Sequence, residues 1–496
     1  MDTNVSSQSR LHELIDPMME AIARIRPVFS RLFAEGDQDI GTFTKSFFSA
    51  TLRPIQDRSD YIDMSSALVE AAQGRSTAER YEIRLRRSPV INTANHLCLE
   101  CLPLTVQSMI LAGLEEDPEG VLPVEACGSI PADNVCFPSG LLLARRSNGK
   151  MLRVPVLELS KRQRRQMTWL LAPFDKGGLE RASLKVAGHF QEGTISVAER
   201  NALMCVLEEV LAAPDVLERS TFREQVSVAV PRLWETWFTL EARKLMPALA
   251  YTPSESVRIP LLIKDVQTAD TLVHRVLFDP ILRREVMTRL DGISGCWTQA
   301  GRQSGSALFW EIGPDGKTAP MTLQGDSLEN AEGKRVHLEP ESLADGLRAG
   351  RLLPTNFLIL AVAMARGLIQ VGGFNQIDYL ATMQQQLSRA LAACGYSDWA
   401  ACLSAALPLM LTAGLGGVAV AYGVGEVQSA GAIEMMAHGG LTPAELDRLK
   451  RLGLREAMAL ELPAIARSVL GESEGTIPEI RDLVEVLEEK LLVFRL

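Results

Sequence analysis

Hydrophobic and polar positions along the chain predict helices at its start and then a parallel sheet with helical crossovers. Residues 10–35 and 60–75 carry apolar side chains at three- and four-residue spacing, which is typical of helices. Farther on, short apolar runs at 89–94 and 121–126 flank a helical segment that Pro103 begins. A strand, a helix and a strand within about forty residues predict a βαβ unit with parallel strands.

The middle of the chain predicts two hairpins with helices between them. Apolar segments on either side of short Gly-containing turns predict antiparallel hairpins over residues 141–156 and 307–323. Helical spacing and a capping-box pattern predict helices over residues 196–211, 221–246 and 269–290, the second of them kinked at a proline.

The later part of the chain returns to strand and helix. Residues 326–335 are polar and contain glycine, which predicts a surface loop. A strand at 368–371, a Gly-Gly turn and a helix over 375–392 follow. Residues 405–422 are apolar for about one membrane span, but a proline and a glycine cluster interrupt them, so they predict a buried helix end and a short strand at 418–422.

A chain of 496 residues is too long for one compact core, and the pattern divides it into five parts. They are an N-terminal helical segment (1–80), the first part of an α/β core (81–185), a largely helical connecting region (186–300), the second part of that core (301–425) and a helical C-terminal region (426–496).

Composition narrows the class of partner. The net charge is −10, and the basic runs are short, so nucleic acid and acidic membrane surfaces are not expected partners. The first ten residues are polar and lack the apolar segment of a secretory signal, which predicts a cytoplasmic protein whose cysteines stay reduced. We therefore expect a protein that acts on a small-molecule substrate.

Three loops follow predicted strands and are the expected site of chemistry, since ligands of open parallel sheets bind beyond the carboxyl ends of the strands. These loops are residues 94–98, 127–134 and 372–376. The third loop precedes a helix, whose free N–H groups and dipole favour an anion. A Gly-Gly pair before a helix is also typical of a simple tight turn.

Each loop supplies candidate site residues. His96 is a candidate general base, with Asp133 either orienting it or binding an ammonium group. The alternative for His96 is a loop histidine satisfied by backbone hydrogen bonds. The other candidates are polar or glycine residues expected to contact substrate, the glycines and Gln376 by binding a carboxylate: Asn95, Ser129, Asn134, Gly372, Gly373 and Gln376.

Cysteines near these loops raise the question of a metal. His96, Cys98 and Cys101 share one segment, and Cys127 and Cys136 lie on the next. Converging loops could enclose zinc, but the chain has a single C-x-x-C and not the paired ligands of structural zinc sites, so we predict no metal site. No P-loop, dinucleotide-binding or hydrolase motif indicates a cofactor.

The segment from Leu352-Leu353-Pro354-Thr355-Asn356 to Leu380 resembles the bacillithiol cysteine-adding enzymes. Those enzymes carry a Ser-Pro-Asn segment, a strand and then Gly-Gly-Pro-Gly-Glu-Ile-Ala-Tyr before a helix. The matching residues here are Gly372, Gly373, Ile377 and Tyr379, whereas the residues at 374–376 and the two earlier loops differ from the family pattern.

The resemblance covers about residues 85–390 and implies a Rossmann-like core with inserted segments. It implies an enzyme that joins an amino acid, such as cysteine, to a small acceptor, with Tyr379 in the substrate site. It also implies a homodimer through a C-terminal coiled coil, although no sustained heptads follow residue 442. Two alternatives remain: a hydrolase or rearranging enzyme of a biosynthetic pathway, with or without zinc at the cysteines, and a non-catalytic partner subunit.

Overall fold

The computed structural model describes residues 2–48, 53–114, 116–147, 150–293, 296–297, 306–314, 316–406, 419–422, 427–470 and 477–495. Its centre is a parallel sheet of four strands in the order β11–β1–β2–β5. These strands are β1 (Val90–Asn92), β2 (Val121–Ala126), β5 (Ala248–Pro253) and β11 (Ile369–Val371). The predicted α/β class and the parallel pairing of the strands at 89–94 and 121–126 are therefore confirmed.

The helices, written with their bounds, are α1 (Asp2–Ile25), α2 (Phe29–Ala34), α3 (Ile40–Phe48), α4 (Ser59–Gln73), α5 (Arg75–Arg87), α6 (Pro103–Gly113), α7 (Lys176–Gln191), α8 (Val197–Cys205), α9 (Pro214–Leu217), α10 (Phe222–Thr236), α11 (Leu240–Arg243), α12 (Ser254–Gln267), α13 (Leu272–Phe278), α14 (Pro280–Arg289), α15 (Pro340–Arg348), α16 (Asn356–Ala365), α17 (Phe374–Ala393), α18 (Ser397–Ala406), α19 (Ala432–Ala437), α20 (Pro443–Arg451), α21 (Leu454–Met458), α22 (Leu462–Leu470) and α23 (Ile480–Leu487). Short 3₁₀ turns occupy Gln163–Arg165 and Thr168–Leu170, and a π-helical turn at Val206–Leu211 extends α8.

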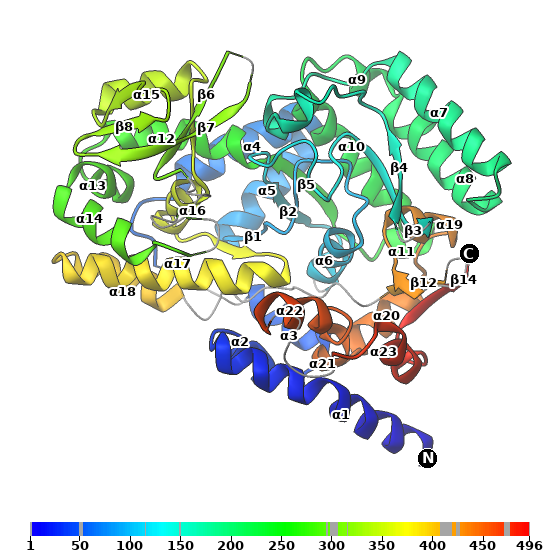
Figure 1. Cartoon of the computed structure of the whole chain (residues 1–496). Helices are drawn as coiled ribbons and strands as arrows, with labels where there is room; N and C mark the ends of the chain where they lie inside the picture. The colour runs from blue at the N-terminus through cyan, green and yellow to red at the C-terminus, as the bar shows by residue number, and fades with distance from the viewer. Residues whose placement is uncertain are drawn as a thin grey trace.

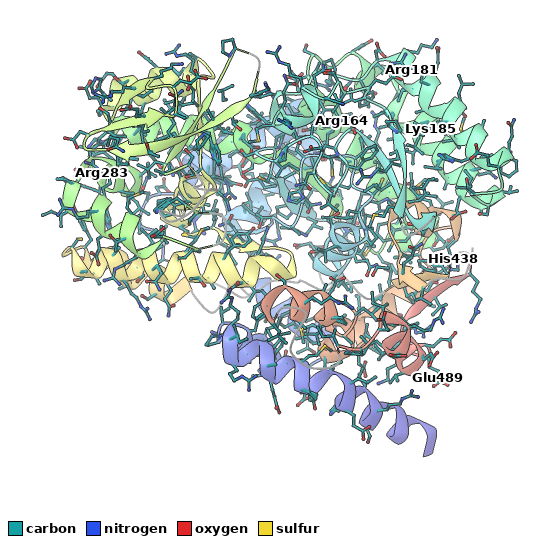
Figure 2. All side chains as sticks on the ribbon, in the orientation of Figure 1. Arg164, Arg181, Lys185, Arg283, His438 and Glu489 are labelled. Carbon is teal, nitrogen blue, oxygen red and sulfur yellow. The ribbon has the colours of Figure 1, made fainter. Side chains whose placement is uncertain are left out.

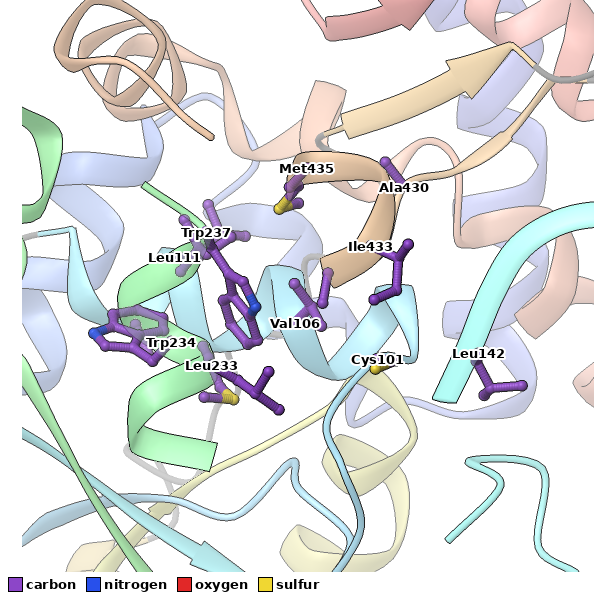
Figure 3. Close-up of a cluster of buried hydrophobic side chains, with 14 of the residues drawn as sticks. Cys101, Val106, Leu111, Leu142, Leu233, Trp234, Trp237, Ala430, Ile433 and Met435 are labelled. Carbon is purple, nitrogen blue, oxygen red and sulfur yellow. The ribbon is translucent and has the colours of Figure 1, made fainter. Parts of the chain in front are cut away.

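Alternate residues of the central strands enter two separate hydrophobic clusters, because successive side chains of a strand point to opposite faces. On β5, Leu249 and Tyr251 belong to one cluster and Ala250 to the other. Figure 1 shows the sheet in the middle of the molecule, with α12 and α16 to one side and α6 and α10 to the other. Figure 3 shows side chains near α6, α10 and α19 in the first cluster, among them Val106 and Trp237.

Both predicted hairpins are present. The first pairs β3 (Gly140–Ser147) with β4 (Lys150–Pro155), and the tip of its turn lies outside the described residues. The second pairs β6 (Phe309–Ile312) with β7 (Thr318–Gln324). It belongs to a second sheet, whose other strands are β8 (Ser327–Asn330), β9 (Arg335–His337) and β10 (Leu352–Pro354).

Several sequence predictions are corrected by the fold. The segment 326–335 is not a loop, because β8 and β9 extend the second hairpin there. The helix predicted over 221–246 ends at Thr236, and the one over 269–290 is broken where Pro280 starts a new helix, since proline lacks the N–H that continuation requires. The connecting region 186–300 is largely helical and also contains the central strand β5.

The C-terminal region, predicted as helical, contains strands as well as helices. The predicted strand at 418–422 is β12 (Ala419–Tyr422), which lies between β13 (Val427–Ser429) and β14 (Leu492–Arg495). The parallel pairing of β12 with β14 ties the last residues back onto the body of the chain. Within the described ranges, no helix is both long and apolar enough to cross a bilayer.

A buried arginine joins the N-terminal helices to the core. Arg366, 1% exposed, forms ion pairs with Asp60 on α4 and Asp265 on α12, both at 2.8 Å. Lys264 reaches Asp60 at 2.9 Å. Burial alone would raise the pKa of Asp60, but Arg366 and Lys264 lower it to about 2. A carboxylate with a lowered pKa stabilises the fold above its unfolded pKa, and this contribution is lost as the pH falls through the folded value.

We therefore expect Asp60→Asn to lower the free energy of unfolding at pH 6, with the difference from wild type shrinking as the pH falls from about 4 towards 2. Urea unfolding at a series of pH values measures this difference. Asp63→Asn is the matched control, since the exposed Asp63 lies on the same helix. A wild-type advantage over Asp60→Asn that is constant from pH 6 to pH 2 would contradict the pairing.

Candidate active site

A cavity of about 310 Å³ lies at the carboxyl ends of the central parallel strands. Residues that follow each of the four strands line it, so segments far apart in the chain meet around one hollow. The polar lining residues are Thr93, His96, Glu125, Cys127, Ser129, Ser254, Glu255, Arg258, Cys296, Ser306, Thr355, Asn356, Gln370, Gln376 and Tyr379, and Trp310 and Leu380 are among the apolar ones.

The loops after β1 and β2 remain paired beyond the ends of the strands. The N–H of Leu97 donates to the carbonyl of Cys127 at 2.8 Å, and the N–H of Cys127 donates to the carbonyl of Asn95 at 2.9 Å. This pairing holds His96 directly beside Cys127 in parallel register. Two of the three predicted loops therefore form one wall of the cavity.

Glu255, in the first turn of α12, fixes the loop after β2. Its Oε1 accepts hydrogen bonds from the N–H and the hydroxyl of Ser129, both at 2.6 Å, and from the N–H of Gly128 at 3.0 Å. Its Oε2 accepts only from the N–H of Gly128, at 2.9 Å, among the described groups. Burial raises the pKa of Glu255, although these donors oppose the shift. Oε2 therefore retains the capacity to accept a hydrogen bond from a ligand.

Below this carboxylate lies a buried ion pair. Arg258 Nε is 2.6 Å from Glu125 Oε1, and its Nη2 donates to Gln370 Oε1 at 3.0 Å. The hydroxyl of Tyr61 donates to Glu125 Oε2 at 2.6 Å. Arg258 and Glu125 neutralise one another, so the net charge of the cavity comes from Glu255 and the protonation state of His96.

The start of α16 forms another part of the wall. Thr355 precedes its first turn and is 4% exposed, yet no side chain caps this helix. The hydroxyl oxygen of Thr355 makes no hydrogen bond to the described residues. Since the first N–H groups of a helix carry partial positive charge, this end of the cavity favours an anion.

His96 lies between the cavity and a group of buried thiols. Its Nδ1 is buried and has no partner among the described residues. Burial lowers the pKa of His96, but interaction with the Cys136 thiol and the nearby Glu100 and Glu255 raises it above its usual value. Hydrogen bonding to Cys98 and to His96 lowers the pKa of Cys136 to about 6. Contact between His96 and Cys136 therefore shifts the two pKa values in opposite directions.

The structure brings four of the predicted site residues together in this cavity: His96, Ser129, Gln376 and Tyr379. Gln376 folds back, and its amide donates to the carbonyl of Thr93 at 2.7 Å. A Cβ atom on Gly372 would lie 1.5 Å from Gln376 Oε1, so this glycine makes room for the amide. Gly373 precedes α17 but is not among the lining residues.

The remaining candidates lie elsewhere. Asp133 is exposed and lines a different hollow, so the pairing of Asp133 with His96 is corrected: Cys136 is the neighbour of the imidazole instead. Asn134 lies in the same turn, where its side chain accepts from the N–H of Cys136 at 3.2 Å. Asn95 is completely buried and does not line the cavity, and its amide lies against the sulfur of Met109.

Sequence reasoning missed Glu255, Arg258 and Thr355. The first two follow β5, a strand that the hydrophobic pattern did not predict. Had this strand been predicted, the acidic residue directly after it would have indicated a candidate site residue. Among the described residues, no group of three or more His, Cys, Asp or Glu side chains could hold a metal ion. The zinc alternative therefore gains no ligand set from the described ranges.

Comparisons with known proteins identify no function for this site. No protein-family model and no curated protein matches the chain.

Proposed function

We propose that this chain is an enzyme that binds a free amino acid, such as cysteine, in the cavity and joins it to a small acceptor on a Rossmann-like core. The observation that carries the proposal is the arrangement of opposite charges in one small hollow. Glu255 lies on one wall, and the uncapped start of α16 with the unpartnered hydroxyl of Thr355 lies on another wall of the described cavity. A zwitterionic amino acid matches this arrangement.

The ammonium group is assigned to Glu255. The carboxylate is buried and held by Gly128 and Ser129, so it does not have to reorganise on binding, and its Oε2 has acceptor capacity left. Because Arg258 is already paired with Glu125, it does not cancel the charge of Glu255. A hydrogen bond to a charged group contributes about 1.5–3 kcal/mol.

The carboxylate group is assigned to the start of α16. The hydroxyl of Thr355 and the first N–H groups of the helix are donors, and the helix dipole adds favourable charge. This assignment replaces the carboxylate site expected at Gly372 and Gly373, where Gln376 already covers the turn.

The base is assigned to His96. An imidazole that lines the cavity can remove the proton from the thiol or amine of the bound amino acid as that group adds to an electrophilic carbon of the acceptor. The imidazolium can then return the proton to the acceptor atom that receives the electron pair of the broken π bond. The resemblance of residues 352–380 to the bacillithiol cysteine-adding enzymes makes cysteine the first substrate to test.

Isothermal titration calorimetry with three related ligands tests the two charge assignments separately. We expect Glu255→Gln to weaken cysteine binding about tenfold or more and to leave the weaker binding of 3-mercaptopropionate, which lacks the amine, nearly unchanged. Thr355→Val should weaken cysteine binding by up to about tenfold and should leave cysteamine, which lacks the carboxylate, unaffected.

Thr322→Val, at an exposed position on β7, is the control for threonine removal. Thermal unfolding of each variant establishes that the fold persists. If Glu255→Gln lowered the affinities for cysteine, cysteamine and 3-mercaptopropionate by the same factor, Glu255 would only hold the loop. Absence of cysteine binding to the wild-type chain would contradict the amino-acid site itself.

A further inference from the structure

A second hollow, of about 370 Å³, lies on the other side of the loop that follows β2. Its lining residues come from this loop, from β4, from the 3₁₀ turn at Gln163–Arg165 and from α7: Ala132, Asp133, Phe137, Ser139, Arg153, Pro155, Leu157, Glu158, Leu159, Arg164 and Lys185. The proposed amino-acid site does not use this hollow. Its volume lies within the range of small-molecule sites.

The charges around this hollow are unbalanced. Arg153, Arg164 and Lys185 line it, and none of the three has an ion-pair partner among the described residues. Figure 2 labels Arg164 and Lys185, together with Arg181 of α7. Glu158 pairs at 3.0 Å with Arg181, which does not line the hollow. Asp133 is thus the one lining carboxylate without such a partner in the described chain. Three cations against one free carboxylate favour an anion with more than one negative charge.

Backbone contacts hold two of these groups in place. The N–H of Asp133 donates to the carbonyl of Arg164 at 2.9 Å, and the N–H of Ala132 donates to the carbonyl of Gln166 at 2.9 Å. The guanidinium Nε of Arg164 donates to the carbonyl of Leu159 at 3.2 Å, which leaves the terminal NH₂ groups for a ligand. An arginine held in this way is suited to the bidentate binding of a phosphate.

An aromatic side chain forms part of the wall, at a cost in backbone energy. Phe137 has φ of 52°, and it is the one non-glycine residue with positive φ in the described ranges. Such a conformation is strained and is typical of functional sites. Gly140 permits the arrangement, since a Cβ there would lie 2.2 Å from the carbonyl of Val154 and 2.9 Å from the Phe137 ring. Arg153 lies over this ring, 5.1 Å from its centre.

We infer that this hollow is a binding site for a small phosphate monoester, with the phosphate on Arg164 and Lys185 and the organic part against Phe137 and the neighbouring leucines. A phosphate monoester carries up to two negative charges at neutral pH and three terminal acceptor oxygens, which match the two free cationic side chains and Arg153. Leu157, Leu159 and Pro155 supply the apolar surface for the organic part. The site is independent of the proposed amino-acid reaction.

Calorimetric titration of the full chain with phenyl phosphate and with inorganic phosphate, at constant ionic strength, tests the inference. We expect both to bind, phenyl phosphate more tightly, and Arg164→Gln and Lys185→Gln each to weaken both by about tenfold. Phe137→Leu should reduce the preference for phenyl phosphate and leave the binding of inorganic phosphate in place.

Lys176→Gln is the matched control, because Lys176 begins the helix that carries Lys185 but does not line the hollow. Equal phosphate affinity in wild type, Arg164→Gln and Lys185→Gln would overturn the inference, as would an equal loss in Lys176→Gln. Since the titration needs neither cysteine nor turnover, its failure would leave the proposed function untouched, and failure of cysteine binding would leave this site untouched.

Discussion

Replacing Arg258 with methionine is expected to lower the free energy of unfolding by about 3–5 kcal/mol. The substitution removes the cation that lies 2.6 Å from Glu125 and leaves that carboxylate buried with only the hydroxyl of Tyr61 as a hydrogen-bond donor in the described surroundings. Gln370 also loses the hydrogen bond that it accepts from Arg258. Urea unfolding at neutral pH measures the change.

The double variant Glu125→Gln with Arg258→Met should recover much of this loss, because no charge then remains without a partner. Arg275→Met is the surface control: Arg275 pairs with Asp270 at 2.7 Å in solvent, so the change in the free energy of unfolding should be small. A loss in Arg258→Met no larger than that in Arg275→Met would refute the buried pair.

The second large effect is expected at His96. His96→Gln should lower the rate of cysteine consumption by about 10²–10⁴-fold, since glutamine cannot accept the proton that a general base removes. Consumption of isotope-labelled cysteine in a small-molecule extract measures the rate even while the acceptor is unidentified. His438→Gln is the control, because that histidine lies away from the cavity and pairs with Glu445.

The pH dependence gives the same assignment a second readout. A base must be unprotonated to act, so its raised pKa places the low-pH loss of activity above pH 6.5, the usual value for histidine. Because Cys136 contributes to the raised pKa of His96, Cys136→Ala should move this limb to lower pH. Unchanged turnover in His96→Gln, or the same low-pH limb in wild type and Cys136→Ala, would contradict the assignment of His96 as the base.

The predictable part of the fold was the part with uninterrupted apolar runs. The strands at 89–94 and 121–126 consist of consecutive buried residues bounded by proline, glycine or polar loops, and they lie where the pattern predicted. The strand β5 reads Ala-Leu-Ala-Tyr-Thr-Pro and has only one β-branched residue. Its apolar pattern is continuous with the helical pattern on both sides, so the sequence did not predict this strand. For the same reason it did not predict the site residues Glu255 and Arg258, which follow the strand.

The sequence predicted only those residues of the candidate site that lie close to the ends of predicted strands. Ser129 stands two residues beyond Cys127, which is paired with the loop after β1, and it lines the cavity as expected. By Asp133 the same loop has turned away to pair with residues 164–168, which places its carboxylate in the second hollow. The path of this loop depends on hydrogen bonds between segments far apart in the chain. The spacing of residues within one loop does not predict these bonds.

The most direct test of the central claim is a crystal structure of the chain soaked with cysteine. We predict density for one cysteine in the cavity, with its ammonium group within hydrogen-bond distance of Glu255 Oε2, its carboxylate at the hydroxyl of Thr355 and its thiol towards His96. Cysteine seated elsewhere, or a cavity that holds only solvent at saturating cysteine, would contradict this prediction.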